Sequence, residues 1–519
     1  WVLSKMGCPS WLIKAVKVLY VGSSVCLSLG FTEGEGFDLS SGIKQGCPMS
    51  GDIWCLIFDP FIRALIEGLS DLDALVAAFA GDLGIPCSDL FAVLRALLPI
   101  VDLMKAAAGL SLNWKKTVFV NFSVYSEFEL RRRIEQMFPV ATTAKISEFA
   151  RYLGFITGPL AHLQSWGRPY KRVLERARHV RSLGLSLFEC VLAFNVFVVS
   201  LLSFHFQLVP VCDFILGGFR LALDIATGTP RHSLGINVLC RLRRLGFPAE
   251  IQDVEAIARA AAYRTARCSE VFSCLLSMQL DAESSDEAAL VQRHRTWRAN
   301  SPMAFLRRIV SEVERIPGVV QLPVVNLQRR MTKLLKGGRS DEPLEDILTD
   351  RIRYFGFRAP REMASRFIRN LSDLAHFVQP FVLAAVLKTV CNAWPTARRF
   401  RTSVGNECKL GCGAELGDDV VHYPFCPVVA EFVRDQGGPS VPIFLRLRSL
   451  SHYMLLHYVN IEDLFITAIF QDVIFQATNA RRSNNNLGTG KGSLFSRLRT
   501  VYTKIPAARK ALRGGFLLR

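Results

Sequence analysis

The sequence lacks the features that mark a secreted protein or a membrane-spanning protein. Its first residues show no basic segment followed by an apolar stretch and a small-residue cleavage site, so they predict no signal peptide. The 14 cysteines are scattered through 519 residues, which excludes a compact disulfide scaffold. The chain begins with Trp1 rather than Met, and we expect it to be a fragment of a longer protein.

Long apolar runs are also missing. The run at residues 190–204 (CVLAFNVFVVSLLSF) is shorter than the ~20 residues that span a bilayer, and it contains Asn195. Glu189 and His205 bound it. A buried helix is therefore the favoured interpretation, and a membrane span, suggested also by a mean hydropathy of +0.25, is the weaker alternative.

Acidic residues are scarce relative to basic ones. The chain has 45 Asp and Glu against 63 Lys and Arg, for a net charge of +18. Such a surplus favours a polyanionic partner, most commonly nucleic acid, although a soluble protein that is merely basic is the alternative. Residues 481–519 have ten Lys or Arg and no acid, and they open with RRSNNNLGTGKGS, which predicts a flexible basic tail.

The pattern of apolar residues changes near Trp166. Before it, helices and short strands are mixed in an α+β order, and after it the pattern is almost wholly helical. Gly109 is predicted to close one helix in the first part. The expected helices there are 11–21, 53–69 with a kink at Pro60, and 90–108; the expected strands are 25–29, 37–39, 75–80, 83–85, 118–122 and 152–156. Further helices are expected within 250–280, 285–315 and 342–395.

Residues 42–50 read GIKQGCPMS and form the most informative loop. Gly42 and Gly46 allow tight turns and a close approach to a ligand, and Gln45 offers an amide donor and acceptor. Pro48 and Ser50 are suited to starting the helix that follows. A loop of this kind before a helix N-terminus suits contact with a nucleotide or a template backbone, and an ordinary turn before a core helix is the alternative.

This loop resembles the template- and nucleotide-contacting motif of the reverse transcriptases of non-LTR retrotransposons and group II introns. Three further segments follow in the order of that family: FAGD at 79–82 resembles the palm hairpin, GLSLNWKKT at 109–117 resembles the motif behind it, and RYLGF at 151–155 resembles the primer grip. The resemblance covers about residues 1–210. It implies a partial right-hand polymerase with an RNA template and a DNA primer or target as partners.

The resemblance also implies that the polymerase chemistry is impaired. The family binds two Mg²⁺ ions through three aspartates, one on the first palm strand and two on the hairpin. Gly81 stands where the first hairpin aspartate is expected, and Asp82 matches the second. No match to the motif of the first palm strand is present. Asp38 is the only aspartate before the glycine loop, and it lies too close to that loop to be the strand aspartate. Lys116 matches a lysine near the departing pyrophosphate. A turn aspartate and a surface lysine are the structural alternatives.

Other residues are assigned on the same grounds. Tyr152, Leu153 and Gly154 correspond to the primer grip. A basic helix follows them where the family places its thumb, and its cationic side chains are expected to contact the nucleic-acid backbone; a solvated helix face is the alternative. These side chains are Arg168, Lys171, Arg172 and Arg176.

Residues 408–426 have the spacing C-x3-C-x9-H-x3-C. Three thiolates and an imidazole form a tetrahedral set suited to structural Zn²⁺, and core cysteines with a lone histidine are the alternative. The segment resembles the knuckle downstream of the polymerase in non-LTR elements. The predicted ligands are Cys408, Cys412, His422 and Cys426. His452 and His457 are expected to be ordinary, because their spacing does not place them on one helix face.

The predicted fold class is α+β, a partial right-hand polymerase followed by a mainly α-helical thumb and connector and a small zinc knuckle. The predicted divisions are fingers and palm 1–160, thumb 161–290, connector 291–400, knuckle 401–432, a helical segment 433–480 and the tail 481–519. We expect an impaired reverse transcriptase without a recognisable endonuclease, in the nucleus or cytoplasm. A non-catalytic nucleic-acid-binding remnant is the alternative.

Overall fold

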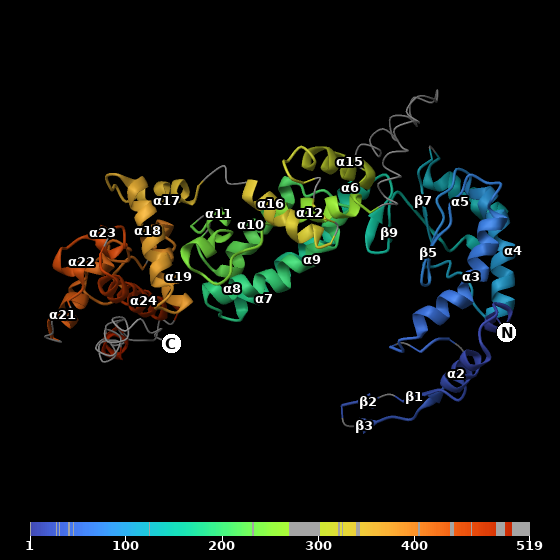
Figure 1. The fold of residues 1–519 in the computed structure, drawn as a ribbon, viewed down its shortest axis with the longest axis horizontal. Helices are drawn as coiled ribbons and strands as arrows, with labels where there is room; N and C mark the ends of the chain where they lie inside the picture. Colours follow the sequence, from blue (N-terminus) through green and yellow to red (C-terminus); the bar gives the residue numbers. More distant parts are fainter. Residues whose placement is uncertain are drawn as a thin grey trace. The chain divides into compact units, whose positions relative to one another are not determined.

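Two compact units make up the chain, one ending at Gln164 and the other beginning at Ser165. Figure 1 shows the elements of each unit in sequence colours. The computed structural model describes residues 2–26, 28–30, 32–39, 42–44, 46–123, 125–230, 233–268, 301–319, 322–323, 325–338, 343–402, 405–435, 441–457, 459–483 and 494–500.

The first unit combines helices with short strand pairs. Its helices are α1 (Val2–Lys5), α2 (Ser10–Tyr20), α3 (Ser50–Gly68), α4 (Leu90–Ala108), α5 (Glu127–Met137) and α6 (Ala161–Gln164). The antiparallel pairs are β1 (Ser24–Val25) with β4 (Phe37–Asp38), β2 (Ser28–Leu29) with β3 (Thr32–Glu33), β5 (Ala77–Phe79) with β6 (Asp82–Gly84), and β9 (Ala150–Tyr152) with β10 (Phe155–Thr157). β7 (Val118–Val120) and β8 (Lys145–Ser147) pair in parallel. A mixture of helix and strand was predicted for this region, although residues 152–156 form a hairpin rather than one strand.

The core of the first unit lies between α3, α4 and α5. Leu65 of α3, Leu94 and Leu97 of α4 and Ile134 of α5 are buried in one cluster, and side chains of the β5–β6 hairpin pack against it. The Asp89 carboxylate caps α4 by accepting hydrogen bonds from two backbone amides. α4 has the predicted bounds, and Gly109 ends it in the left-handed conformation as predicted. This packing fixes the hairpin relative to α3 and α4.

The second unit is helical in the part that the structure describes. Its helices are α7 (Gly167–Ser182), α8 (Leu187–Phe194), α9 (Ser200–Ser203), α10 (Asp213–Thr227), α11 (Ile236–Leu239), α12 (Val254–Ala266), α15 (Pro302–Val313), α16 (Leu327–Gly338), α17 (Leu344–Arg353), α18 (Pro360–Leu374), α19 (Pro380–Val390), α20 (Ala397–Phe400), α21 (Pro427–Asp435), α22 (Ile443–Arg446), α23 (Leu450–Tyr453) and α24 (Ile461–Ser483). α12, α15 and α16 share one buried cluster that includes Tyr263, Leu306 and Met331. α7 packs on α10, and α19 packs on α24.

The apolar run at 190–204 is helical, as predicted, but only one side of it is buried. α8 continues through the π-helical turn Asn195–Val199 into α9, and Phe194, Val198 and Leu202 are buried. The Asn195 side chain donates to the carbonyl oxygen of Glu250 (2.9 Å) and accepts from the amide of Gln252 (3.0 Å). In the described residues, no helix combines the length and apolar character that crossing a bilayer requires.

The predicted flexible tail differs from the structure at its start. α24 extends to Ser483, so the first three residues of the expected tail are helical. Residues 494–500 are also helical, and Leu494 and Leu498 are fully buried. These two leucines form an apolar face that packs in the interior. The prediction of a flexible tail rested on the surplus of arginine and lysine and did not take this face into account. The remaining tail residues, like the helices expected over 269–300, lie outside the described residues.

The two hydrogen bonds of Asn195 generate a stability prediction. Asn195→Leu removes the hydrogen bonds to the Glu250 carbonyl oxygen and from the Gln252 amide, and each such bond contributes a net of about 0.5–1.5 kcal/mol to stability. We expect the melting temperature of the second unit to fall by several degrees in a thermal scan followed by circular dichroism. Val196→Ala, at an exposed position of the same turn, is the control. Equal melting temperatures for Asn195→Leu and wild type would contradict this role.

Candidate nucleic-acid interface and metal centre

The glycine loop is held closed by Ser50. Its hydroxyl donates to the carbonyl oxygen of Lys44 (2.5 Å) and contacts the Tyr20 hydroxyl (3.0 Å). Gly42 and Gly46 have φ values of 97° and 85°, which L side chains rarely adopt. α3 begins at Ser50, so a helix starts in this segment as predicted, three residues earlier than Ile53. The Ser50 side chain makes no capping hydrogen bond, and its hydroxyl closes the loop instead. Pro48 is exposed in the same loop, and Gln45 lies outside the described residues.

The FAGD segment forms the tip of the β5–β6 hairpin. Phe79 pairs with Asp82, so Ala80 and Gly81 are a two-residue turn in which Ala80 has a φ of 52°. A Cβ atom added at Gly81 would meet nothing within 4 Å, and Gly81 does not have a left-handed φ. The turn therefore does not require glycine at position 81. An aspartate would fit there without steric conflict.

Two side chains from distant parts of the chain bind the backbone of this hairpin. The Trp54 indole of α3, one turn after the glycine loop, donates to the carbonyl oxygen of Ala80 (2.9 Å). The Tyr152 hydroxyl donates to the carbonyl oxygen of Ala77 (3.3 Å), and its ring lies against Gly84 so closely that a Cβ there would be 3.1 Å from Cζ. Partial burial and, to a lesser extent, the Asp82 charge raise the pKa of Tyr152. The helix that follows the glycine loop thus contacts the hairpin at its tip, and Tyr152 contacts it at the opposite end, where Ala77 pairs with Gly84.

The turn after Tyr152 completes this arrangement. Leu153 and Gly154 connect β9 to β10 with φ values of 47° and 91°. Lys116 lies in a separate exposed turn, where its backbone amide donates to the carbonyl oxygen of Asn113 (2.9 Å). Both turns carry the residues that the sequence singled out, and neither supplies a carboxylate.

Asp82 is exposed at the start of β6. Across the described residues, one group of three or more Cys, His, Asp or Glu side chains converges closely enough to hold a metal ion, and Asp82 does not belong to it. A pair of divalent ions in a polymerase site needs several carboxylate oxygens. The described residues around the hairpin offer one of the expected ligands.

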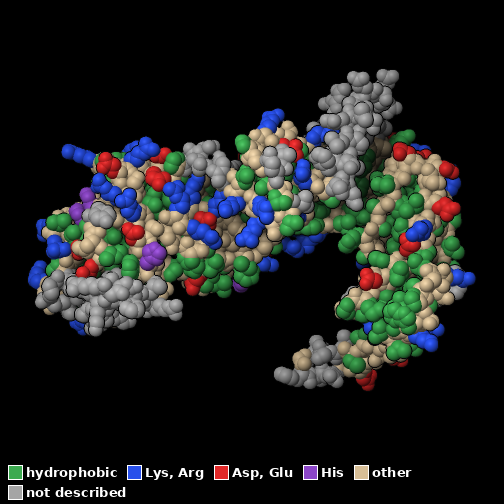
Figure 2. Space-filling model, viewed as in Figure 1, with side chains coloured by type: hydrophobic (Ala, Val, Ile, Leu, Met, Phe, Trp, Pro, Cys, Tyr) green, Lys and Arg blue, Asp and Glu red, His purple; other side chains and the backbone are tan. Residues whose placement is uncertain are grey.

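The cationic helix has the amphipathic form that its sequence predicted. Val173, Ala177 and Val180 of α7 are buried, and the helix packs on α10. On the opposite face of α7, four positively charged side chains are exposed. These side chains are Arg168, Lys171, Arg172 and Arg176. Figure 2 shows many Lys and Arg side chains on the visible face of the second unit.

The predicted metal ligands come together in the second unit. The ligand atoms of Cys408, Cys412, His422 and Cys426 all lie within 4.8 Å of one another. The Cys408 and Cys426 sulfurs are 3.7 Å apart, and the Cys412 sulfur is 3.3 Å from His422 Nε2. A tetrahedral Zn²⁺ with bonds of about 2.3 Å to sulfur and about 2.0 Å to nitrogen requires edges of roughly 3.5–3.8 Å. The donor set therefore fits a tetrahedral ion such as Zn²⁺.

The loop backbone shapes this donor set. Gly411 and Gly413 have φ values of 79° and 82°, which turn the chain on either side of Cys412. The Cys408 amide donates to the carbonyl oxygen of Ala414 (3.1 Å). The hydrogen bond with Cys426 lowers the pKa of the Cys408 thiol to about 3, and the same contact raises the pKa of Cys426. A thiolate is thus favoured among the ligands, as a metal ion requires.

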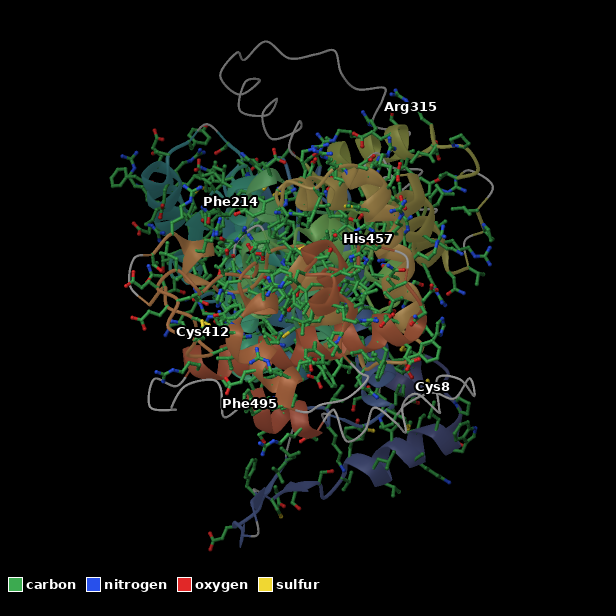
Figure 3. All side chains as sticks on the ribbon, turned by 90° about the vertical axis from the view of Figure 1, so that its left-hand side faces the viewer. Cys8, Phe214, Arg315, Cys412, His457 and Phe495 are labelled. Carbon is green, nitrogen blue, oxygen red and sulfur yellow. The ribbon has the colours of Figure 1, made fainter. Side chains whose placement is uncertain are left out.

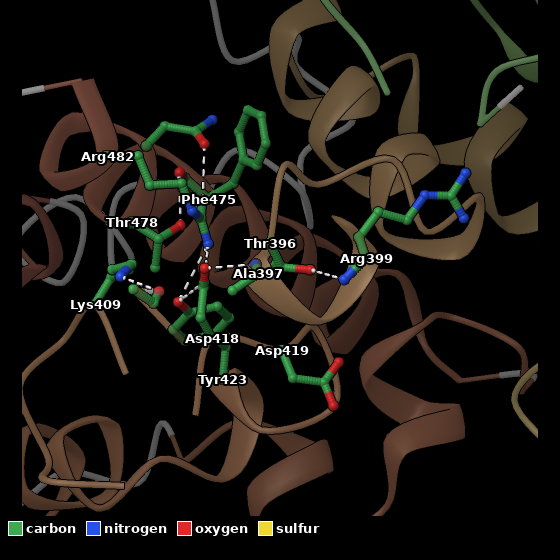
Figure 4. Close-up of polar contacts among 12 residues, drawn as sticks. Thr396, Ala397, Arg399, Lys409, Asp418, Asp419, Tyr423, Phe475, Thr478 and Arg482 are labelled. Atoms are coloured by element: carbon green, nitrogen blue, oxygen red, sulfur yellow. Dashed lines mark hydrogen bonds and ion pairs between the residues drawn. The ribbon is translucent and has the colours of Figure 1, made fainter. Parts of the chain in front are cut away.

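Asp418, nearly fully buried, ties the metal loop to its surroundings. Its carboxylate accepts from the Ala397 amide (2.8 Å), the Tyr423 hydroxyl (2.5 Å) and the Arg482 guanidinium of α24. Figure 4 shows these contacts meeting at one carboxylate. The neighbouring Asp419 pairs with Arg398 at 2.7 Å. These bonds join the metal loop to α20 and to the end of α24. The spacing of the metal ligands in the sequence does not predict them.

One histidine contact was not predicted from the sequence. The rings of His452 and His457 stack at 4.2 Å, and each accepts or donates a hydrogen bond with a serine hydroxyl at 2.8 Å. Burial lowers the pKa of both. Leu455, with a φ of 56°, turns the chain between them, which a helical reading of the spacing missed. Figure 3 shows His457 well apart from Cys412, so the pair is separate from the metal centre.

The donor set predicts about one zinc ion per full-length chain, measured by atomic emission after dialysis. Cys408→Ser and Cys426→Ser should lower this to below about 0.3, because each removes a thiolate ligand. Cys212→Ser changes an exposed cysteine and should leave the content unchanged. Affinity should also fall as the pH is lowered, because protons compete for the thiolates. Zinc-free protein at neutral pH would rule out the site.

Comparison with known proteins gives one informative match. No protein-family profile matches the chain. Over 109 residues, or 20% of its length, the chain is 25% identical to the "Transposon TX1 uncharacterized 149 kDa protein" of Xenopus laevis. The chain thus spans 8% of the length of this curated relative, so its similarity concerns a short part of that protein. This similarity supports a transposon origin for the chain.

Proposed function

We propose that the chain is a nucleic-acid-binding part of a non-LTR retrotransposon reverse transcriptase whose polymerase site is catalytically impaired. The observation that carries the proposal is the pair of hydrogen bonds that Tyr152 of the primer-grip segment and Trp54 of α3, the helix that follows the glycine loop, donate to the β5–β6 hairpin. These three parts of the chain are far apart in sequence, and an accidental resemblance of the motifs gives no reason for them to lie together. Similarity to a transposon protein supports the same origin.

The arrangement supports binding more strongly than chemistry. Nucleotide addition in this family depends on two ions that clamp the attacking and leaving oxygens. Gly81 offers no ligand, and Asp82 stands outside every group of three or more ligands in the described residues. Losing one electrostatic contact in a transition state commonly costs 10²–10³ in rate, and loss of metal ligands costs more. Lys116, which matches a lysine near the departing pyrophosphate, is not expected to support nucleotide addition without the two metal ions.

Binding requires neither magnesium nor the missing carboxylates. The exposed cations of α7 suit the phosphates of an RNA–DNA duplex, which positive side chains position without reading sequence. In this proposal the CCHC centre holds a structural zinc ion that organises the surface around α20. The alternative function is a non-catalytic nucleic-acid-binding remnant of a decayed retroelement. Weak primer extension that depends on Asp82 would favour the first function over this alternative.

Purified chain given a primed RNA template, Mg²⁺ and deoxynucleotides should extend no primer above background. Gly81→Asp should fold normally, because a Cβ at this position meets nothing within 4 Å, and it should still not extend the primer, because one ligand of three is still missing. Primer extension on a denaturing gel measures both. Robust extension by wild type that disappears in Asp82→Ala would overturn the proposed impairment.

The α7 surface predicts salt-dependent binding of single-stranded RNA. Arg172→Gln combined with Arg176→Gln should raise the Kd at least fivefold and reduce the slope of log K against log salt by about 1–1.5, since each phosphate contact contributes about 0.7. Fluorescence anisotropy at several salt concentrations measures both quantities. Arg95→Gln, an exposed arginine of α4, should change little. Equal slopes for wild type and the double variant would exclude α7 from the interface.

A further inference from the structure

An exposed pair of aromatic rings lies where α7 meets the start of α10. The ring of Tyr170 in α7 is 4.9 Å from the ring of Phe214 in α10, with 46° between the two planes. Phe214, labelled in Figure 3, is the second residue of α10 and is 65% exposed. A single exposed apolar side chain is ordinary on a protein surface, so the role of Phe214 depends on what surrounds it.

The backbone of α10 holds Tyr170 in place. Gly218 of α10 is buried, and a Cβ atom there would be 2.0 Å from Cε2 of Tyr170, so the ring lies directly on the helix backbone. Further along, the Arg181 guanidinium lies against Gly228 in the same way. Tyr170 and Arg181 are roughly three helical turns apart, so both lie on the side of α7 that faces α10. The ring behind Phe214 is therefore held in place before any ligand binds.

Positive charge adjoins this aromatic pair. α7 carries six Lys or Arg side chains and one acid. Because a helix turns by roughly 100° per residue, Lys171 and Arg178 lie about 80–100° around α7 from Tyr170, on the side that adjoins α10. Both side chains are exposed. Arg172 and Arg176 lie more than about 110° from Tyr170 on the other side of the helix.

An aromatic surface beside exposed cations suits a single-stranded polynucleotide. Unpaired bases stack on aromatic rings, and Lys and Arg side chains contact the phosphates between them. Asp213 is exposed beside Phe214 in the sequence, and its charge disfavours a phosphate at the ring itself. A neutral base is therefore favoured over Phe214, with the phosphates on the side of Lys171. The positive surplus of α7 favours this polyanion over an apolar peptide.

We propose that Phe214, backed by Tyr170, stacks on one unpaired base of a single-stranded polynucleotide whose phosphates contact Lys171 and Arg178. The choice of a polynucleotide rests on the proposed function. The proposal adds a contact with a base, whereas the cations of α7 contact only the backbone. It also requires a single strand at this point, because the faces of paired bases are covered by their neighbours.

The test measures binding of the full chain to an oligo(U) RNA of about 12 nucleotides and to a strand of the same length in which every sugar is abasic. Phe214→Ala should raise the Kd for oligo(U) about 5- to 50-fold, the loss expected for one stacked base, and should change the Kd for the abasic strand less than twofold. The slope of log K against log salt should equal that of wild type, because no phosphate contact is lost. Phe214→Trp should keep the affinity, since its larger ring also stacks. Fluorescence anisotropy measures each of these quantities.

Phe381→Ala is the matched control, because Phe381 is also the second residue of its helix, α19, and is 46% exposed. It should change the Kd less than twofold. Phe214→Leu keeps an apolar side chain against Tyr170 but has no ring, and it should lose affinity as Phe214→Ala does. Melting temperatures within about 2 °C of wild type verify that the variants fold, as expected for changes at exposed positions. Lys171→Gln combined with Arg178→Gln should weaken binding of both strands and lower the salt slope.

Three results would overturn the proposal. Equal losses for oligo(U) and the abasic strand in Phe214→Ala would indicate an effect on backbone contacts and no stacking. A loss no larger than that of Phe381→Ala would remove Phe214 from the interface, and binding that still depends on Arg172 and Arg176 would then leave the proposed function intact. If wild type binds no strand at any salt concentration, the proposed function fails together with the stacking contact.

Discussion

The buried carboxylate of Asp418 holds the C-terminal part of the second unit together. It accepts hydrogen bonds from the start of α20, from Tyr423 beside the metal ligands and from Arg482 at the end of α24. Its side chain is 3% exposed and that of Arg482 is 14% exposed, so removing either partner leaves a buried charge uncompensated, at a cost of about 3–5 kcal/mol. Metal binding, the position of α20 and the end of α24 therefore depend on one another.

The first unit relies on a different constraint, the backbone of a short hairpin. A two-stranded hairpin is marginal by itself, and β5–β6 gains its stability from apolar packing on α3 and α4 and from side chains that bind its carbonyl groups. Trp54 and Tyr152 make those bonds to Ala80 and Ala77, and neither bond involves a catalytic carboxylate. The geometry around the tip can therefore persist while glycine occupies position 81.

Local patterns predicted the elements well where each depends on nearby residues. α4 was predicted with its cap because its apolar period and Gly109 are both local signals, and the four metal ligands were found from their spacing. The contacts that were not predicted depend on how the backbone folds back on itself. The stacking of His452 on His457 needs the reversal at Leu455, and the three hydrogen bonds of Asp418 come from residues up to 64 positions away, so no pattern within a single segment indicates either.

Binding and catalysis place unequal demands on such a chain. A polymerase site works only if every metal ligand is positioned to within a fraction of an ångström, so one glycine in place of an aspartate is enough to disable it. Phosphate binding by exposed arginines is distributed over many contacts of modest strength, and the loss of one leaves the others in place. The exposed face of α7 depends on the packing of that helix against α10. It does not depend on Gly81 or Asp82, so the nucleic-acid binding proposed for this face does not require an intact polymerase motif.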